Sequence, residues 1–388
     1  MSNSERWLQI VQKLLEQPTA AIREELPQAY IREFAREHPA LALSQDASGN
    51  LMLGYSVSSA QSPPLVMVAH LDHPGFWVQS VSGSTAELLF KGGVDLKHAK
   101  EGSPVRFFAP GDPSPISVGM GTLGAATGEK GRLERATANI KEGRAIPGGF
   151  AMWDFPGFSL NAGLIVSRCC DDLLGAAAAL CVLDEIAARK PGGIGVWALF
   201  TGAEEIGFYG ALEAIRHGTV PKNACVLSLE CSKALSNASQ GEGVIVRVGD
   251  KASIFDPELS EALRRAAAGV AKSDPNFKYQ RKLMDGGSCE ASAFCGYGYR
   301  ASGLALPLGN YHNQGFDTAG NPEIGPESVN LADFMCEIQL LIELAMHPEL
   351  LCKTSGAPGW LETRAQEARA ALGGEVSVDT VKTRDQEM

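Results

Sequence analysis

Five short segments of this chain each end a hydrophobic run with a side chain that can bind a metal ion. They are Val66–His73, Ser167–Gly175, Ala198–Gly210, Val226–Ser232 and Leu308–Gly315. Together they supply two histidines and several carboxylates, a ligand set suited to two zinc-like ions and a general base. Such a set predicts metal-assisted hydrolysis of an amide bond.

His70 and Asp72 stand two residues apart, directly after the apolar run Val66–Ala69. On an extended chain they share a face, so Asp72 could accept a hydrogen bond from the ring nitrogen that His70 does not offer to a metal. The alternative is a surface-loop histidine followed by an unrelated aspartate. His73 lies close enough to touch a substrate, a question that the sequence leaves open.

Asp171 and Asp172 stand between an apolar stretch and the Ala-rich run Leu173–Ala188. Two carboxylates at the start of a helix could merely cap it and interact with its dipole. The functional interpretation gives Asp171 a bridging position, because the two oxygens of one carboxylate can each bind a different ion.

Glu204 and Glu205 form the most specific local signal, because they lie between the apolar run Ala198–Phe200 and Gly207. Buried acidic side chains are costly unless cations accompany them. One of the two can bind metal while its neighbour stays free as the general base that takes a proton from the attacking water. An exposed acidic loop is the alternative, and its apolar flanks disfavour it.

Glu230 ends the buried run Val226–Leu229 and is expected to bind the second ion. His312 lies in the turn-rich segment Gly309–Asn313 and would complete the shell of that ion. Taken alone, His312 would be interpreted as a structural histidine. Four histidines lack acidic neighbours of this kind and are expected to be structural: His38, His98, His217 and His347.

Apolar strands and helices alternate around these residues. The expected strands are Leu51–Tyr55, Leu65–Ala69, Ile194–Phe200 and Ala224–Leu229, and the expected helices are Ile22–Glu37, Leu173–Ala188, Ile206–His217, Pro257–Ala271 and Asn330–His347. This alternation predicts an α/β fold with an open, mostly parallel sheet and helices on both faces. Such sheets place ligands at the carboxyl ends of their strands, where His70, Glu204 and Glu230 stand.

The pattern changes between about Phe76 and Gly163, where short alternating stretches such as Ala86–Phe90 and Ile116–Gly119 are separated by Gly, Pro and Asp turns. This pattern of short alternating stretches and turns predicts a small inserted β-barrel-like domain. We therefore expect a catalytic domain in two parts (1–75 and 164–350), an inserted domain (76–163) and a polar tail (351–388). The end of the tail, Val376–Met388, is expected to be mobile.

The composition excludes several classes of protein. Among 388 residues, 45% are hydrophobic and 20% charged, as in ordinary soluble proteins, and the net charge of -11 argues against nucleic acid or an anionic membrane as partner. Met1–Pro18 is polar and lacks the apolar core of a signal peptide, so none is expected, and no apolar run comes near the ~20 residues that span a bilayer. Nine cysteines without a C-x-x-C pair fit a reducing cytoplasm, the expected location.

The chain resembles the zinc-dependent aminopeptidase superfamily over roughly Leu8 to His347. It is most similar to the tetrahedral-aminopeptidase branch, which includes glutamyl aminopeptidases and proteins labelled endoglucanases. The motifs that carry the resemblance are Asp-x-x-Gly-Asn-Leu at Asp46–Leu51, A-H-x-D at Ala69–Asp72, D-D-x-x-G at Asp171–Gly175, E-E-x-G-x-x-G-A at Glu204–Ala211, and a late histidine, His312.

This resemblance implies a dinuclear site, with zinc as the expected metal and cobalt or manganese as alternatives. The implied ligands are His70, Asp171, Glu205, Glu230 and His312. Glu204 is implied as the general base and Asp72 as the residue that orients a ligand. The resemblance also implies an aminopeptidase acting on small peptides, and a homo-oligomer assembled through the inserted β domain.

The chain departs from the pattern of the branch at several positions. His73 stands where Glu is usual, Leu173 where Arg is usual, and Glu230 where Asp is usual. In place of the usual Gly-Gly-Thr-Asp this chain has Gly-Gly-Ser-Cys-Glu at Gly286–Glu290. In place of the usual Tyr-x-His it has Asn-Tyr-His-Asn at Asn310–Asn313. Substrate preference therefore does not transfer. A related dipeptidase, carboxypeptidase or deacylase, and an inactive peptide-binding homologue, remain the alternatives.

Overall fold

The computed structural model describes residues 3–56, 62–112, 114–193, 195–352 and 359–372. The tail end Val376–Met388, expected to be mobile, lies outside the described residues, as does Ile194 at the start of one expected strand. Within the described part of the chain, no helix is long and apolar enough to cross a membrane.

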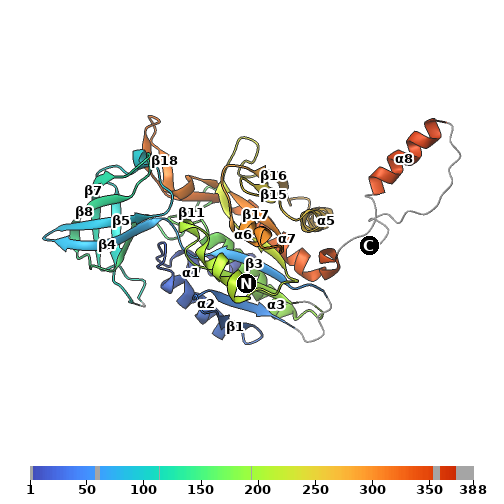
Figure 1. Cartoon of the computed structure of the whole chain (residues 1–388), viewed down its shortest axis with the longest axis horizontal. Coiled ribbons are helices and arrows are strands. Elements are labelled where there is room, and N and C mark those ends of the chain that lie inside the picture. Colours follow the sequence, from blue (N-terminus) through green and yellow to red (C-terminus); the bar gives the residue numbers. More distant parts are fainter. Residues whose placement is uncertain (1–2, 57–61, 113, 194, 353–358, 373–388) are drawn as a thin grey trace.

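A twelve-stranded sheet forms the larger part of the molecule (Figure 1). In chain order its strands are β1 Ala42–Gln45, β2 Leu51–Tyr55, β3 Leu65–His70, β10 Ser159–Asn161, β11 Leu164–Ser167, β12 Val196–Thr201, β13 Cys225–Ser228, β14 Cys231–Lys233, β15 Val244–Asp250, β16 Tyr279–Met284, β17 Arg300–Gly309 and β20 Glu327–Asn330. The main path runs β1-β2-β12-β3-β13-β17-β20-β11-β10. Its middle strands β12, β3, β13 and β17 are parallel, and antiparallel strands flank them.

Helices cover both faces of this sheet. They are α1 Asn3–Leu15, α2 Glu25–Glu37, α3 Leu173–Arg189, α4 Tyr209–His217, α5 Pro257–Ser273, α6 Glu290–Gly296 and α7 Leu331–Met346, and the separate α8 Gly359–Ala371 follows in the tail. The described residues also form four short 3-10 turns: η1 Leu96–His98, η2 Glu204–Ile206, η3 Tyr311–Asn313 and η4 Pro348–Leu351.

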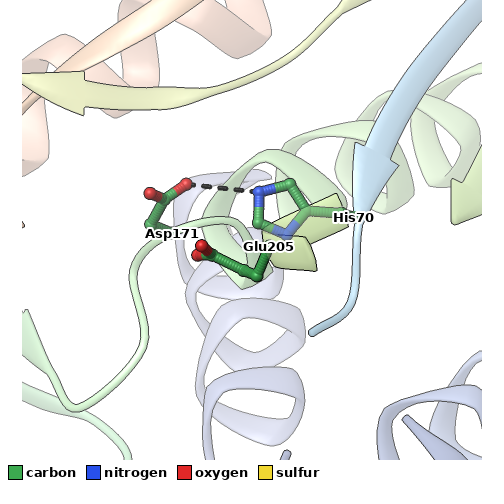
Figure 2. Close-up of side chains that lie close together, drawn as sticks. All are labelled: His70, Asp171 and Glu205. Carbon is green, nitrogen blue, oxygen red and sulfur yellow. Dashed lines mark ion pairs between the residues drawn. The ribbon is translucent and has the colours of Figure 1, made fainter. Parts of the chain in front are cut away.

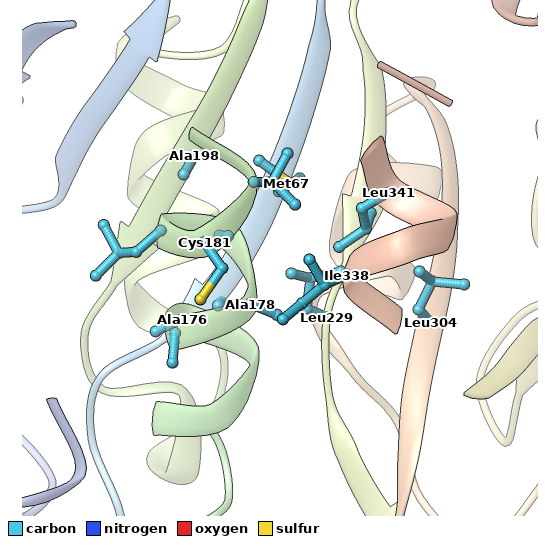
Figure 3. Close-up of a cluster of buried hydrophobic side chains, with 14 of the residues drawn as sticks. Met67, Ala176, Ala178, Cys181, Ala198, Leu229, Leu304, Ile338 and Leu341 are labelled. Carbon is cyan, nitrogen blue, oxygen red and sulfur yellow. The ribbon is translucent and has the colours of Figure 1, made fainter. Parts of the chain in front are cut away.

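Successive side chains of a strand point to opposite faces of the sheet, so in a strand buried on both faces they pack in two different clusters. Leu65 and Met67 of β3 pack in the cluster that contains α3 and α7, whereas Val66 and Val68 pack with α4 and α6. Figure 3 shows the first cluster, in which Met67 lies beside α3 and the side chains of α7 face it. The predicted fold class, an open α/β sheet covered on both sides, is confirmed.

The insertion is a closed six-stranded barrel, seen at the left of Figure 1. Its strands are β4 Gly75–Ser82, β5 Thr85–Lys91, β6 Pro104–Phe108, β7 Gly119–Thr127, β8 Arg135–Gly143 and β9 Phe150–Trp153, joined in the order β4-β5-β8-β7-β6-β9. Phe76, Phe107 and Trp153 are buried in its core. The predicted inserted barrel is confirmed, whereas the domain limits 1–75, 76–163, 164–350 and 351–388 stay a prediction. A separate hairpin, β18 Gln314–Phe316 with β19 Pro322–Ile324, also lies outside the large sheet.

Three expected elements differ most from their observed bounds. The helix expected from Ile22 begins only at Glu25, because Ile22 has a φ of 63° that a right-handed helix excludes. The helix expected over Ile206–His217 is interrupted by positive φ at Gly207 and Phe208, and α4 starts after them. In the expected stretch Ile116–Gly119, residues 116–118 form a loop and only Gly119 belongs to a strand, as the first residue of β7.

Candidate metal centre

His70 is the last residue of β3, and its exposed fraction is 1%. Its Nδ1 lies 3.1 Å from the backbone oxygen of Asp72, and 3.6 Å from the Asp72 carboxylate. The Asp72 side chain instead accepts the backbone N–H groups of Glu204, at 2.9 Å, and Glu205, at 3.2 Å. Asp72 therefore orients His70 mainly through its backbone, and its carboxylate fixes the loop that carries the two glutamates.

Asp171 lies between the two histidines. Its Oδ1 is 3.4 Å from Nε2 of His70, and its Oδ2 is 3.6 Å from Nε2 of His312. Figure 2 shows the carboxylate of Asp171 directed at the His70 ring, with Glu205 beside both. Burial alone would raise the pKa of Asp171, but the neighbouring His312 and His70 hold it well below its usual range. Each oxygen of this carboxylate thus faces a different histidine.

Glu205 and His312 come together from distant parts of the chain. Glu205 follows β12 in η2, and its Oε1 lies 3.1 Å from Nε2 of His312. Nδ1 of His312 lies 2.8 Å from the carbonyl oxygen of Gly93 in the barrel domain, which leaves Nε2 as the nitrogen that points to the carboxylates. Burial lowers the pKa of His312, but Glu205 and Asp171 raise it to about 10.

Glu204 precedes Glu205 in η2, and its Oε2 lies 4.0 Å from Nε2 of His70. Burial raises the pKa of the Glu204 carboxyl well above its usual range, and Glu205, Glu230 and Asp72 add to the effect while His70 opposes it. A carboxyl group with a raised pKa holds a proton more readily than an ordinary glutamate, as a group that shuttles protons must.

Glu230 follows β13 and lines the same cavity as His70, Asp171 and Glu204. Its Oε1 accepts a hydrogen bond of 3.0 Å from Ser228. Burial raises the pKa of Glu230 to about 7, and the charge of His70 opposes this shift. The expected grouping of Glu230 with His312 on one ion is not what the structure favours, because His312 lies against Glu205.

A carboxylate that the sequence did not reveal joins two of these segments. Glu327 begins β20 and is fully buried; its Oε2 accepts the N–H groups of Cys170 at 2.7 Å and Asp171 at 3.1 Å. Its Oε1 accepts the N–H of His312 at 2.8 Å. One side chain therefore fixes the backbone of both Asp171 and His312. Neither motif nor spacing marks Glu327, because its role depends on contacts between segments remote in sequence.

We expect Glu327→Gln to weaken metal binding by about 10- to 100-fold, the usual effect of altering a residue that orients metal ligands. Gln keeps the size of Glu but turns an NH₂ group toward backbone N–H donors. Metal titration followed by calorimetry measures the effect, with the exposed Glu323→Gln of the nearby hairpin as matched control. Equal affinity of both variants would contradict this role.

Both ring nitrogens of His73 lie against oxygens of the protein itself. Its Nδ1 lies 2.6 Å from the backbone oxygen of Asp171, and its Nε2 lies 2.9 Å from the side-chain oxygen of Asn313. The ring of Tyr311 stacks on His312 with 3.7 Å between centroids. His73 therefore holds the backbone at Asp171, and Tyr311 holds the ring of His312.

The donor set fits divalent metal ions. Ligand atoms of His70, Asp171 and Glu205 all lie within 4.8 Å of one another. Oδ1 of Asp171 and Oε1 of Glu205 are buried and accept no hydrogen bond from the described residues, although a histidine nitrogen lies near each of them. Buried carboxylate oxygens without a donor are expensive, and a bound cation would satisfy them. Neutral imidazole with carboxylates is a donor set that zinc, cobalt and manganese accept.

Comparison with known proteins identifies the family. A family model described as M42 glutamyl aminopeptidase matches residues 49–315, more than half of the chain. No curated protein matches the chain. Among solved structures, an aminopeptidase from the archaeon Desulfurococcus kamchatkensis has a TM-score of 0.72 at 18% identity, covering 90% of this chain and 97% of that one.

Two further structures come from the same branch that the sequence motifs indicate. The TET1 peptidase of Pyrococcus horikoshii has a TM-score of 0.69 at 19% identity, with coverage of 87% of this chain and 99% of that one. An endoglucanase from Thermotoga maritima has a TM-score of 0.63 at 16% identity, with coverage of 88% and 98%. These structures share the fold, and the matched family model extends from the turn before β2 to the His312 segment. The chain belongs to the M42 glutamyl aminopeptidase family and is a metal-dependent aminopeptidase.

Proposed function

We propose that this protein removes N-terminal residues from small peptides with two divalent ions, most suitably zinc, and that it works in the cytoplasm. The observation that carries the dinuclear part is Asp171, whose two oxygens face different histidines at 3.4 and 3.6 Å. His70, Asp171 and Glu230 would hold one ion, and Asp171, Glu205 and His312 the other. The ions, when bound, would polarise the scissile carbonyl and make a water molecule acidic near neutral pH.

Glu204 is the proposed general base. It would accept the proton of the attacking water and then give it to the departing amine. Its carboxyl lies beside His70, and its backbone N–H donates a hydrogen bond to the Asp72 carboxylate. This hydrogen bond fixes the position of the backbone that carries the Glu204 side chain. Asp72 therefore serves catalysis by positioning both Glu204 and His70.

A substrate screen tests this function. We expect cleavage of unblocked dipeptides and tripeptides by the metal-loaded protein, and no cleavage when the N-terminal amine is acetylated. A preference for N-acylated substrates would indicate a deacylase, and a requirement for a free C-terminus with an acylated N-terminus would indicate a carboxypeptidase. If the fully metal-loaded protein cleaved none of these peptides, the proposal would be contradicted.

We also propose that the barrel carries the contacts of a homo-oligomer. The related Pyrococcus horikoshii peptidase can assemble into a tetrahedron or an octahedral shell. In this chain the barrel is a complete closed domain that projects from the α/β domain, and Ile116 at its loop is 75% exposed. Homo-oligomers assemble through matching surfaces of their subunits, and a surface on the barrel that includes Ile116 would cover this apolar side chain.

Light scattering is expected to show more than one subunit for the intact chain. A variant in which a short Gly-Ser linker replaces Gly75–Trp153 should be smaller by more than the mass of the deleted residues, because its subunits separate. A single substitution, Ile116→Glu, tests one part of the surface without deleting a domain. A monomeric intact protein at micromolar concentration would refute this proposal.

A further inference from the structure

The loop that carries Glu204 and Glu205 is held by two carboxyl groups from different parts of the chain. Asp72 accepts the N–H groups of Glu204 and Glu205. The preceding residue, Ala203, donates its N–H to Oε1 of Glu24 over a distance of 3.0 Å. Three successive N–H groups of this loop therefore end on carboxyl oxygens, and Glu24 holds the first of them.

The same oxygen of Glu24 also accepts the N–H of Ile22, at 2.9 Å. Ile22 and Ala203 have φ values of 63° and 56°, so both N–H groups that Glu24 binds belong to residues in the left-handed region. Residues other than glycine rarely adopt this region unless surrounding contacts hold them there. One carboxyl oxygen thus joins two strained turns, one before α2 and the other after β12.

The geometry of the peptide group explains why the turn at Ala203 depends on both carboxyl groups. A peptide unit is planar, so only the φ and ψ angles of Ala203 separate the unit that carries its own N–H from the unit that carries the N–H of Glu204. Glu24 binds the first unit and Asp72 binds the second, which keeps Ala203 in its left-handed conformation. Because Asp72 also holds the N–H of Glu205, the Cα–Cβ bond of Glu204 keeps its direction.

The surroundings of Glu24 agree with this use of its side chain. Glu24 directly precedes α2, yet its side chain makes no capping hydrogen bond to that helix. A Cβ atom at Gly202 would lie 3.1 Å from the carboxyl carbon of Glu24, so the group packs closely on the backbone of the loop. Glu24 and Ala203 line a cavity that none of the proposed metal ligands lines. The carboxyl group therefore acts on the loop from outside the metal centre.

We infer that Glu24 is a positioning residue for the proposed reaction: it fixes the backbone turn at Ala203 and thereby keeps Glu204 directed into the metal centre. The inference rests on the proposed function, in which Glu204 is the general base. Misplacing a reacting group by about 1 Å can cost on the order of 10²-fold in rate, so a contact behind the base has a measurable effect on kcat.

The loop needs an acceptor oxygen from Glu24 rather than a negative charge. Both of its hydrogen bonds to backbone N–H groups use the single oxygen Oε1. Burial and the negative charge of Asp72 raise the pKa of Glu24 to about 8, so near neutral pH the group is largely an uncharged acid. The reach of the side chain is therefore the property that a test has to change.

Two variants separate reach from charge. Glu24→Gln keeps the length of the side chain and an acceptor oxygen, whereas Glu24→Asp keeps the carboxyl group and withdraws it by one methylene. We expect Glu24→Gln to retain kcat within about threefold of the wild type, because a neutral acceptor of equal reach still makes the hydrogen bond. We expect Glu24→Asp to lower kcat by about 10- to 100-fold. KM and metal content should stay unchanged in both, because no ligand is altered.

Glu25→Gln and Glu25→Asp are the matched controls, because they make the same changes one residue further on, at an exposed position. Both should keep wild-type kinetics. A Glu24→Asp enzyme as active as the wild type, or a Glu24→Gln enzyme that loses about tenfold or more in kcat, overturns the inference. A loss of metal ions in proportion to activity also overturns it, because the loop would then fail through Glu205. The proposed function fails separately, when the wild type itself cleaves no unblocked peptide.

Hydrogen exchange followed by mass spectrometry provides a readout that does not depend on catalysis. In the wild type and in Glu24→Gln, the amides of Ala203 and Glu204 should exchange as slowly as those of β12, because buried side chains accept their hydrogen bonds. In Glu24→Asp, exchange at Ala203 should be about tenfold faster or more, while exchange in β12 is unchanged. Equal acceleration in β12 would indicate a general loss of stability and overturns the inference. Rapid exchange of this loop in the wild type also overturns it, even if Glu24→Asp does not fold.

Discussion

Glu204→Gln is expected to abolish hydrolysis while leaving the fold and the metal content intact. Gln keeps the size of the side chain and removes its basicity, so the expected loss in kcat is at least the ~10²–10⁴-fold typical of a general base. The backbone N–H of residue 204 still binds Asp72, so the loop keeps its position. Steady-state kinetics together with elemental analysis of the purified variant measure both quantities.

Glu205→Gln is the matched comparison, since it makes the same chemical change one residue away. Glu205 lies 3.1 Å from His312 and is a proposed ligand, so its neutralisation should lower the metal content as well as the activity. If instead Glu204→Gln kept near-normal turnover, or Glu205→Gln retained two ions while inactive, the two roles would be reversed.

The sequence could locate these residues because the parallel strands of an α/β sheet end at one edge. β3 ends at His70, β12 leads directly to Glu204, and β13 leads to Glu230. β12 and β13 both pair with β3 in parallel, so their carboxyl ends must be neighbours. Apolar strands followed by polar residues therefore carry enough information to predict both the sheet and the edge where ligands gather.

The sequence could not predict how the backbone turns after each strand. Ala203, Asn310 and His312 have φ values of 56°, 53° and 54°, which residues other than glycine rarely adopt. These turns direct Glu204 and His312 into the cavity, and remote groups such as Glu327 hold them there. Strained local conformations of this kind depend on tertiary contacts, so no local pattern reveals them.

Long-range partners were missed for the same reason. The pairing of His312 with Glu205 joins residues more than 100 positions apart. The spacing A-H-x-D suggested that Asp72 binds the His70 ring with its carboxylate. In the structure that carboxylate binds the N–H groups of residues 204 and 205, a contact across the sheet edge.

Asp171→Asn is expected to remove both ions and all activity, a larger effect than any change to a single-ion ligand. The variant keeps one oxygen but replaces the other with an NH₂ group, and it removes the negative charge that lies between His70 and His312. An amide cannot bridge two cations with compensating charge, so affinity should fall by more than the ~10–100-fold typical of residues that only orient ligands.

Elemental analysis after reconstitution and dialysis should give about two ions per wild-type chain and close to none for Asp171→Asn. Asp172→Asn is the matched control, because Asp172 accepts the N–H of Gly175 at the start of α3, and Asn is an equally good residue at that position. The control should retain both ions and measurable turnover. A wild type that saturates at one ion, or an Asp171→Asn variant that retains two, would contradict the bridging role. Either result would mean that Asp171 does not bind both the ion beside His70 and the ion beside His312.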